Sequence, residues 1–271
     1  MLTEKIPKII FIVPYRDREK EKIHFSYYMT YIMEDYKEDD YAIYYSQQPD
    51  GLPFNRGAVK NMGFIAMKHK YPNNYKEITF VFNDIDTVPA KKNTFNYETK
   101  NGIIKHFYGF QFALGGIFSI TGHNFEKCNG FPNLWGWGIE DNEIQRRVLS
   151  QKLEINRTEF YPLNSREVIH LYDSPNRLIS GETPRDFIKK ELRDNLNTIY
   201  NFEYVIEKNE NVSSKLETTN QFIINIKKFK TLEEPKINNF YVQDIHKNPK
   251  LRVDTLKRNN TIKWNLKKFY H

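Results

Sequence analysis

The sequence lacks the features that mark disulfide scaffolds and membrane-spanning chains. It has one cysteine, Cys128, so an intrachain disulfide is impossible. No apolar stretch approaches the roughly 20 residues that a membrane helix needs, and no apolar leader precedes the first predicted strand. We therefore expect a chain without a membrane span.

Acidic residues are also in the minority. The 34 Asp and Glu are outnumbered by 41 Lys and Arg, which leaves a formal net charge of +7. A basic surface favours anionic partners such as nucleic acids or phosphate groups. Because the sequence has no nucleic-acid-binding motif and no dense stripe of Arg and Lys, we interpret the excess as a solubilising surface and predict no nucleic-acid partner.

Aromatic residues, in contrast, are abundant, with 20 Phe and 18 Tyr in 271 residues, enough to fill the core of one large α/β domain. We expect strands at residues 8–13, 41–45 and 77–82 and helices at residues 23–33, 57–70 and 140–152. The alternation of apolar, β-branched runs with helical patterns predicts a sheet with right-handed crossovers. Ligands of such sheets gather beyond the carboxyl ends of the strands, where Pro14, Gln47 and Asp84 lie.

The composition changes towards the C-terminus. Residues 208–271 are rich in Lys and Asn and hold only short apolar runs such as Phe222–Ile226. We therefore expect a main domain over residues 1–207, followed by an extension or small accessory unit over residues 208–271.

The first group with chemical potential is Asp84-Ile-Asp86, directly after the third predicted strand. Residues i and i+2 of a strand point to the same face, so the two carboxylates converge. Such oxygen ligands suit Mn²⁺ or Mg²⁺ bound to a diphosphate. The alternative is an ordinary solvated turn.

The second group runs from Gly130 to Asn142 and places two Trp, separated by Gly, directly before Glu140 and Asp141. Glycines allow a ligand to approach the backbone, and Trp offers a flat apolar wall. An acid beside such a wall is partly desolvated, which suits a general base. The alternative is a Gly-rich turn that caps the helix beginning near Glu140.

A third group is Glu167-Val-Ile-His170, whose Glu and His could both face a metal from a helical turn or a loop. A hydrogen-bonded structural His is the alternative. Arg16, Arg18 and Arg56 lie near strand ends, where a guanidinium can form paired hydrogen bonds with phosphate.

Together these groups resemble the β-1,4-galactosyltransferase family over roughly residues 8–205. The motifs that carry the resemblance follow the family's order: Pro14-Tyr-Arg-Asp-Arg18, Phe54-Asn-Arg56, Asn61-Met-Gly-Phe64, Asp84-Ile-Asp86, Gly115-Gly116, Asn129-Gly-Phe131, Trp135-Gly-Trp-Gly138 and Glu140-Asp141. His170-Leu-Tyr-Asp173 and Leu196-Asn-Thr198 look most like the xylosylprotein galactosyltransferase branch.

The resemblance implies a GT-A fold, that is, a Rossmann-like mixed sheet flanked by helices. It also implies an inverting reaction with a UDP-sugar donor, a Mn²⁺ cofactor (or Mg²⁺) and a saccharide or glycoprotein acceptor. Asp86 and His170 would ligate the metal, with Glu167 as third ligand, and Asp141 would be the catalytic base. The donor-binding residues implied in the same way are Pro14, Tyr15, Arg16, Arg18, Phe54, Arg56, Asp84, Gly116, Trp137, Gly138 and Glu140.

Three positions depart from the family pattern. Ile139 replaces a residue that is usually Gly or Arg, and Asn142 replaces an acid that helps to bind the acceptor. Ala113 falls where the family carries a Tyr beside the donor sugar. Because the smaller side chain leaves room for a bulkier 2-substituent, we hypothesise that UDP-GalNAc or UDP-GlcNAc is accepted as well as, or instead of, UDP-galactose.

Two alternatives remain at this point. One is a carbohydrate-binding protein with a decayed transferase fold, against which the intact acids argue, and the other is a nucleic-acid-binding protein, which charge alone suggests. We expect a cytoplasmic protein; the alternative is the lumenal catalytic domain of a trimmed Golgi-type enzyme.

Overall fold

A computed structural model describes residues 5–171, 176–181, 193–209 and 220–244. Its α-helices are α1 (Glu19–Ile32), α2 (Arg56–Lys70), α3 (Gly122–Lys127) and α4 (Glu140–Ser150). Its strands are β1 (Ile9–Tyr15), β2 (Tyr41–Gln47), β3 (Thr79–Asn83), β4 (Thr87–Pro89), β5 (Ile103–Gly109), β6 (Ile117–Thr121), β7 (Glu154–Asn156), β8 (Tyr161–Pro162), β9 (Val168–His170), β10 (Asn176–Ser180), β11 (Tyr200–Lys208), β12 (Gln221–Lys230) and β13 (Phe240–Asp244). Short 3₁₀ helices span Glu38–Asp40, Leu196–Thr198 and Ile237–Asn239.

Nine of the described strands form one mixed sheet, with the order β11-β12-β2-β1-β3-β6-β5-β7 and β8 beside β5. β1 pairs in parallel with both β2 and β3, whereas β6 runs antiparallel to β3 and β5. The expected strands and helices of the first half of the chain are confirmed, with ends that differ by a few residues. The GT-A fold is thus the observed fold class: a mixed Rossmann-like sheet between helices.

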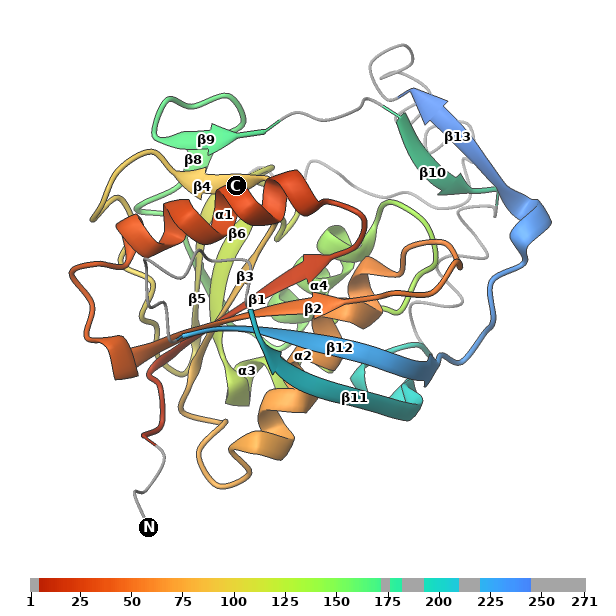
Figure 1. The fold of residues 1–271 in the computed structure, drawn as a ribbon, viewed down its shortest axis with the longest axis horizontal. Coiled ribbons are helices and arrows are strands. Elements are labelled where there is room, and N and C mark those ends of the chain that lie inside the picture. Colours follow the sequence, from red (N-terminus) through yellow and green to blue (C-terminus); the bar gives the residue numbers. More distant parts are fainter. Residues whose placement is uncertain (1–4, 172–175, 182–192, 210–219, 245–271) are drawn as a thin grey trace.

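Helices cover both faces of the sheet (Figure 1). On one face, Phe25 and Met29 of α1 join the cluster that contains Phe11 and Val13 of β1. On the other face, residues of α2, α3 and α4 pack against Ile10 and Ile12 of the same strand. The alternation of side chains along β1 explains why consecutive apolar residues fill two separate cores.

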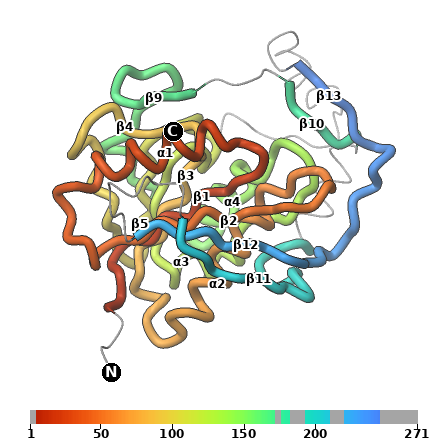
Figure 2. The backbone as a smooth tube through the Cα atoms, in the orientation of Figure 1, coloured from red at the N-terminus to blue at the C-terminus, as the bar shows by residue number. Residues whose placement is uncertain are grey.

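The C-terminal part of the chain corrects one expectation. β12 pairs in parallel with β2 and antiparallel with β11, and Figure 2 shows these distant segments side by side. The expected domain boundary after residue 207 would therefore separate two paired strands, so residues 221–230 belong to the main sheet and not to an accessory unit. β10 and β13 form a separate ribbon at the periphery (Figure 1), and residues 245–271 lie outside the described ranges.

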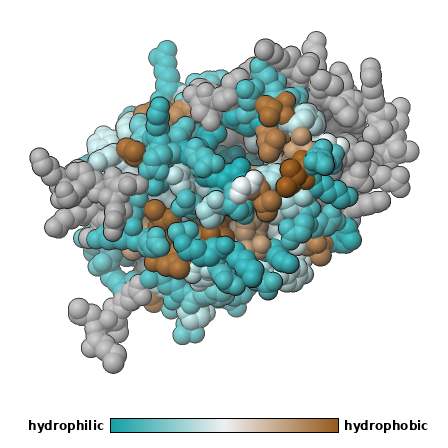
Figure 3. Space-filling model, turned by 45° about the vertical axis from the view of Figure 1, so that its right-hand side comes forward, coloured by the Kyte–Doolittle hydropathy of each residue, from teal (hydrophilic) through white to brown (hydrophobic). Residues whose placement is uncertain are grey.

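The surface is mainly hydrophilic on the face that Figure 3 presents, with hydrophobic residues in separate patches. None of the helices in the described ranges combines the length and the hydrophobicity that crossing a membrane requires.

Candidate active site

The Asp84-x-Asp86 segment lies at the carboxyl edge of the parallel strands. β3 ends at Asn83, whose side-chain amide donates to the carbonyl groups of Asp84 at 2.8 Å and Thr87 at 2.9 Å. The Asp84 N–H donates to the carbonyl of Gly116 at 2.9 Å. These bonds fix the turn, so both carboxylates project from a rigid backbone.

His170 reaches this edge because β9 pairs with β4, which places His170 opposite Thr87. Its Nε2 lies 3.8 Å from Oδ1 of Asp86, and its Nδ1 lies 3.1 Å from the hydroxyl of Tyr108. Arg18 forms an ion pair with the other Asp86 oxygen at 3.2 Å. An aspartate and an imidazole 84 residues apart in sequence therefore face each other, at the two positions that the family resemblance implies as metal ligands.

A chain of ion pairs continues from Asp84 towards the Trp-rich segment. Arg56 contacts Asp84 and places its Nε 3.9 Å from Glu140. Lys60, one helical turn further along α2, lies 2.9 Å from Oδ1 of Asp141 and 4.0 Å from Oδ1 of Asp84. The acids that follow β3 and those at the start of α4 thus share one network, which includes two cations of a single helix.

Burial and neighbouring charges shift the pKa values of the carboxyl groups in this network. Burial and, next, the charge of Asp84 raise the pKa of Asp86 above its usual range. Burial also raises the pKa of Asp84, but Arg56 and Lys60 outweigh it, so the net shift is downward. The pKa of Glu140 is raised by burial and then by Asp141. The cationic side chains of the site therefore do not fully compensate the negative charge of its carboxylates, and this favours the binding of a further cation.

The start of α4 holds Asp141 against the loop that precedes β6. The N–H of Leu114 donates to the Asp141 carbonyl at 2.9 Å, and a Cβ added to Gly115 would lie 2.6 Å from Asp141 Oδ2. Ile139, the N-cap of α4, has φ of 77°, a left-handed conformation that costs a β-branched residue energy. Ile139, at a position where the family resemblance implies Gly or Arg, therefore places backbone strain directly before Glu140 and Asp141.

The residues expected to bind the donor differ in their exposure and in the partners that they contact. The Arg16 guanidinium lies 5.3 Å from the centroid of the Phe54 ring and donates to the carbonyl of Leu52. Pro14 and Tyr15 are buried in β1, and the Tyr15 hydroxyl donates to Glu19 at 2.6 Å. Pro14 and Tyr15 therefore shape the end of β1 and do not offer free polar groups to a ligand.

The Trp-rich loop is anchored to its neighbours by backbone hydrogen bonds. The Trp137 N–H donates to the Leu178 carbonyl at 2.8 Å, and Trp137 and Gly138 are both partly exposed. Gly138 has φ of 115° and Gly116 has φ of 68°, and a Cβ on Gly116 would lie 2.4 Å from the Tyr108 carbonyl. Both glycines thus hold conformations that other residues rarely adopt. Asn142, the departure at the acceptor position, donates to the carbonyl of Phe112 at 3.2 Å.

Glu167 is not grouped with the metal candidates. The described residues include no cluster of three or more His, Cys, Asp or Glu side chains that could hold a metal. The sequence argument assumed a helical turn or a loop, but residues 168–170 form a strand. Glu167 itself lies in the turn directly before this strand, where its carbonyl accepts a hydrogen bond from the N–H of Ala90 at 2.8 Å. A metal role for Glu167 stays a prediction.

Asp86 and His170 nevertheless suit a divalent cation. Carboxylate oxygen and imidazole nitrogen are ligands that Mn²⁺ accepts, and a hydroxyl on the second ring nitrogen, as Tyr108 provides, orients such a ligand. Asp84 Oδ1 is buried and accepts no hydrogen bond from any residue that the structure describes. The donor set therefore fits a cation with two protein ligands whose other positions are filled by a substrate or water.

Comparison with known proteins agrees with this geometry. Residues 4–98 match the N-terminal region of glycosyl transferase group 7, and residues 104–174 match a family described as the N-terminal domain of galactosyltransferase. The chain belongs to the β-1,4-galactosyltransferase family. The Asp84-x-Asp86, Trp-rich and His170 motifs all fall inside these two matches.

Named relatives within the β-1,4-galactosyltransferase family are distant. β-1,4-Galactosyltransferase 1 of Mus musculus is 29% identical over 178 residues, which are 62% of this chain and 43% of that protein. Xylosylprotein 4-β-galactosyltransferase of Caenorhabditis elegans is 28% identical over 214 residues, 74% of this chain and 72% of that protein. The chain spans about half the length of the mammalian β-1,4-galactosyltransferase 1 proteins that it matches.

Solved structures of the family share the fold. The catalytic domain of Drosophila β1,4-galactosyltransferase 7, in complex with xylobiose, superposes with a TM-score of 0.65 at 20% identity, over 90% of this chain and 98% of that one. A mutant of the same Drosophila protein superposes with a TM-score of 0.57 at 21% identity, over the same shares of the two chains.

Sequence reasoning missed two residues of this family member's site. Lys60 and Tyr108 contact Asp141 and His170, respectively, yet neither belongs to a motif. The signal for Lys60 was its spacing of four residues from Arg56 within a helix that is otherwise apolar on that side.

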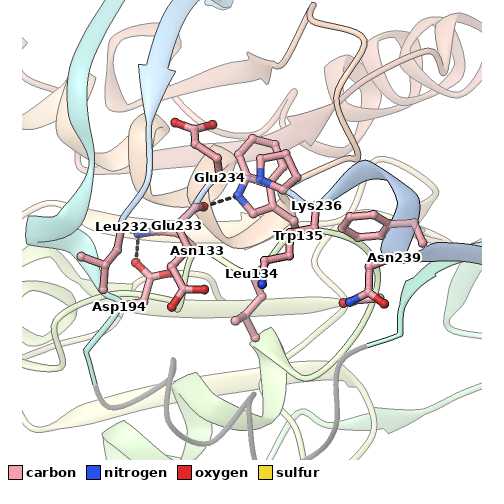
Figure 4. A pocket seen from close by; sticks show the side chains of 12 residues that line it. Asn133, Leu134, Trp135, Asp194, Leu232, Glu233, Glu234, Lys236 and Asn239 are labelled. Atoms are coloured by element: carbon pink, nitrogen blue, oxygen red, sulfur yellow. Dashed lines mark hydrogen bonds between the residues drawn. The ribbon is translucent and has the colours of Figure 1, made fainter.

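A pocket beside the Trp-rich loop was not expected either. Figure 4 shows it between Asn133–Trp135 and residues 232–240, with the Trp135 indole donating to the Glu233 carbonyl at 2.9 Å. Asn133 donates to Asp194 at 2.8 Å, and burial raises the pKa of that carboxyl. The C-terminal segment therefore forms one wall beside the loop that carries Trp137.

Proposed function

We propose that the chain is an inverting, metal-dependent glycosyltransferase that moves a sugar from a UDP-sugar to a hydroxyl of a saccharide or glycoconjugate. The observation that carries the proposal is the ion-pair network that joins Asp84 to Asp141 through Lys60, next to Asp86 with its partners Arg18 and His170. Membership in the family supports a galactosyl donor. The Drosophila mutant was crystallised with manganese, UDP-Gal and xylobiose, which supports the donor and cofactor classes.

Each part of the site has a task in this proposal. Asp86 and His170 would hold the cation, which when bound neutralises negative charge on the diphosphate. Arg16, Arg18 and Arg56 would supply positive charge for the nucleotide, and Glu140 would accept hydrogen bonds from sugar hydroxyls.

Asp141 would take the proton from the acceptor hydroxyl. The oxygen attacks the anomeric carbon from the face opposite UDP, the bond from that carbon to the phosphate oxygen breaks, and the configuration inverts. Asp141 is suited to this task because its side chain is 22% exposed at the start of α4, whereas Glu140 beside it is 5% exposed. A base must reach both the substrate and a supporting protein scaffold.

The donor sugar is the finer part of the proposal. Ala113 is buried, and its N–H and carbonyl are engaged with Phe110 and Gly115, so its short side chain is fixed in place. UDP-galactose is the first candidate, with UDP-GalNAc and UDP-GlcNAc as candidates for the room beside Ala113. The compartment, cytoplasmic or lumenal, stays a prediction.

The experiment that tests the proposal is UDP release from UDP-galactose, UDP-GalNAc and UDP-GlcNAc, with Mn²⁺ or with a chelator, across a panel of saccharide acceptors that includes xylobiose. We expect acceptor-dependent release that needs Mn²⁺, and a loss of about 10²–10⁴-fold in kcat for Asp141→Asn. The matched control is Asp39→Asn, which removes an exposed carboxylate paired with Lys5. Tight UDP binding without turnover would favour a carbohydrate- or nucleotide-sugar-binding protein instead.

A further inference from the structure

Lys60 is an unusual lysine because its side chain is only 1% exposed. It lies within α2, where neighbours such as Val59 and Met62 are fully buried apolar residues. Its ammonium group lies 4.6 Å from the centre of the Phe131 ring. An ammonium group loses its hydration when it is buried, so it persists there only with compensating partners.

The two compensating partners come from opposite sides of the candidate active site. Lys60 Nζ donates to Oδ1 of Asp141 at 2.9 Å and lies 4.0 Å from Oδ1 of Asp84. That Asp84 oxygen is the buried acceptor for which the described residues provide no hydrogen-bond donor. One ammonium group therefore lies between Asp84, which follows β3, and Asp141, the proposed base at the start of α4.

Contacts on Asp141 define what the lysine contributes. Oδ2 of Asp141 abuts Gly115, and the backbone of Asp141 is tied to Leu114. Oδ1 is held by Lys60 at the other end of the same carboxylate. With Oδ1 occupied, the orientation of the group is set, and Oδ2 is the oxygen that is turned towards the loop before β6.

Arg56 cannot take over this role. Its guanidinium is already in contact with Asp84 and lies near Glu140, and burial lowers its pKa less than Asp84, Asp141 and Glu140 raise it. Removal of Lys60 would leave the carboxylates of Asp84, Glu140 and Asp141 with one guanidinium, that of Arg56. Asp84 and Glu140 would then repel Asp141 without a cation between them.

We propose that Lys60 is a positioning residue for sugar transfer: its buried ammonium group fixes the Asp141 carboxylate and couples it to Asp84. This inference rests on the proposed function, because it assigns Lys60 an effect on the step that Asp141 carries out. Lys60 itself does not touch the substrates. Its effect is therefore on the rate of the transfer step and not on donor binding.

The test compares Lys60→Met, Asp141→Asn and the double variant in full-length protein with Mn²⁺ and the best donor and acceptor. We expect Lys60→Met to lower kcat by about 10²-fold, because a small misplacement of a catalytic group has that effect. The KM for the donor and the Kd for UDP by calorimetry should stay within about threefold. In the Asp141→Asn background, the same substitution should change kcat by no more than about twofold, since Lys60 acts through Asp141.

The matched control is Lys68→Met in the same helix, where the ammonium group pairs with Glu126 away from the site. We expect its kcat to equal that of the wild type. If Lys60→Met does not fold, Lys60→Gln is measured in its place with the same readouts.

A kcat unchanged by Lys60→Met, or a further 10²-fold loss in the Asp141→Asn background, would overturn the positioning role while the proposed function stands. A wild-type chain that turns over no UDP-sugar would overturn both.

Discussion

His106 should make the stability of this protein sensitive to mild acid. The imidazole is 1% exposed at β5, and burial, followed by the nearby charge of Arg157, lowers its pKa to about 3. Nε2 lies 3.1 Å from the Tyr108 carbonyl and 3.2 Å from the Gly115 carbonyl, and since a carbonyl only accepts, the ring donates there. Arg157 donates to Nδ1 at 3.2 Å, which leaves no acceptor for a second ring proton.

The sign and size of the effect follow from these contacts. A His with a pKa near 6.5 in the unfolded chain and about 3 in the folded chain binds a proton first in the unfolded state. The stability that the neutral ring contributes is complete above pH 6.5 and is lost as the pH falls towards 3. Between pH 7 and pH 5, the loss is about 2 kcal/mol at about 1.4 kcal/mol per unit of pKa.

The assay is urea unfolding at pH 7 and pH 5, followed by the fluorescence of the three Trp residues. His106→Gln keeps a donor and an acceptor but does not titrate, so its free energy of unfolding should fall by about 2 kcal/mol less than that of the wild type over this pH range. His123→Gln, at an exposed position of α3, is the control and should behave as the wild type does. Equal pH dependence in wild type and His106→Gln would refute the reasoning.

Two further predictions concern the loop that His106 supports. Gly115→Ala should lower kcat by about 10²-fold with little change in melting temperature, because the added Cβ would lie 2.6 Å from Asp141 Oδ2, the movable end of a side chain. Steady-state kinetics measure kcat, and thermal unfolding measures the melting temperature. A normal kcat would show that Oδ2 needs no fixed position. Ala113→Tyr should raise the preference for UDP-galactose over UDP-GalNAc and UDP-GlcNAc by about 10-fold or more in kcat/KM. An unchanged ratio of kcat/KM values would mean that Ala113 does not border the donor sugar.

The elements that could be predicted from sequence are those with local signals. The apolar run before Asp84 and the helical pattern of α2 each specify their structure within about 15 residues, and parallel pairing then brings their ends to one edge. His170 could be connected to Asp86 only through resemblance to a family, because the β4–β9 pairing that joins them spans more than 80 residues.

Features that depend on distant contacts could not be predicted in this way. Lys60 reads as an ordinary helical lysine until α4 is placed beside it, and the pattern around Glu167 did not indicate the strand β9 that follows it. The Lys- and Asn-rich composition after residue 207 likewise gave no indication that β12 belongs to the main sheet. In β12, Gln221, Ile224 and Ile226 are buried and the other residues are partly or fully exposed, and its partner β2 lies almost 180 positions earlier.

The placement of β12 has a consequence for the synthesis of the protein. Until residue 230 has left the ribosome, the outer side of β2 carries a row of unpaired N–H and C=O groups next to an apolar core. Nascent chains would therefore expose an unpaired, aggregation-prone strand edge for most of their translation. Completion of the sheet must be a late step in folding. Truncations that end before β12 should consequently be recovered as aggregates, even though they contain every acid and arginine of the candidate active site.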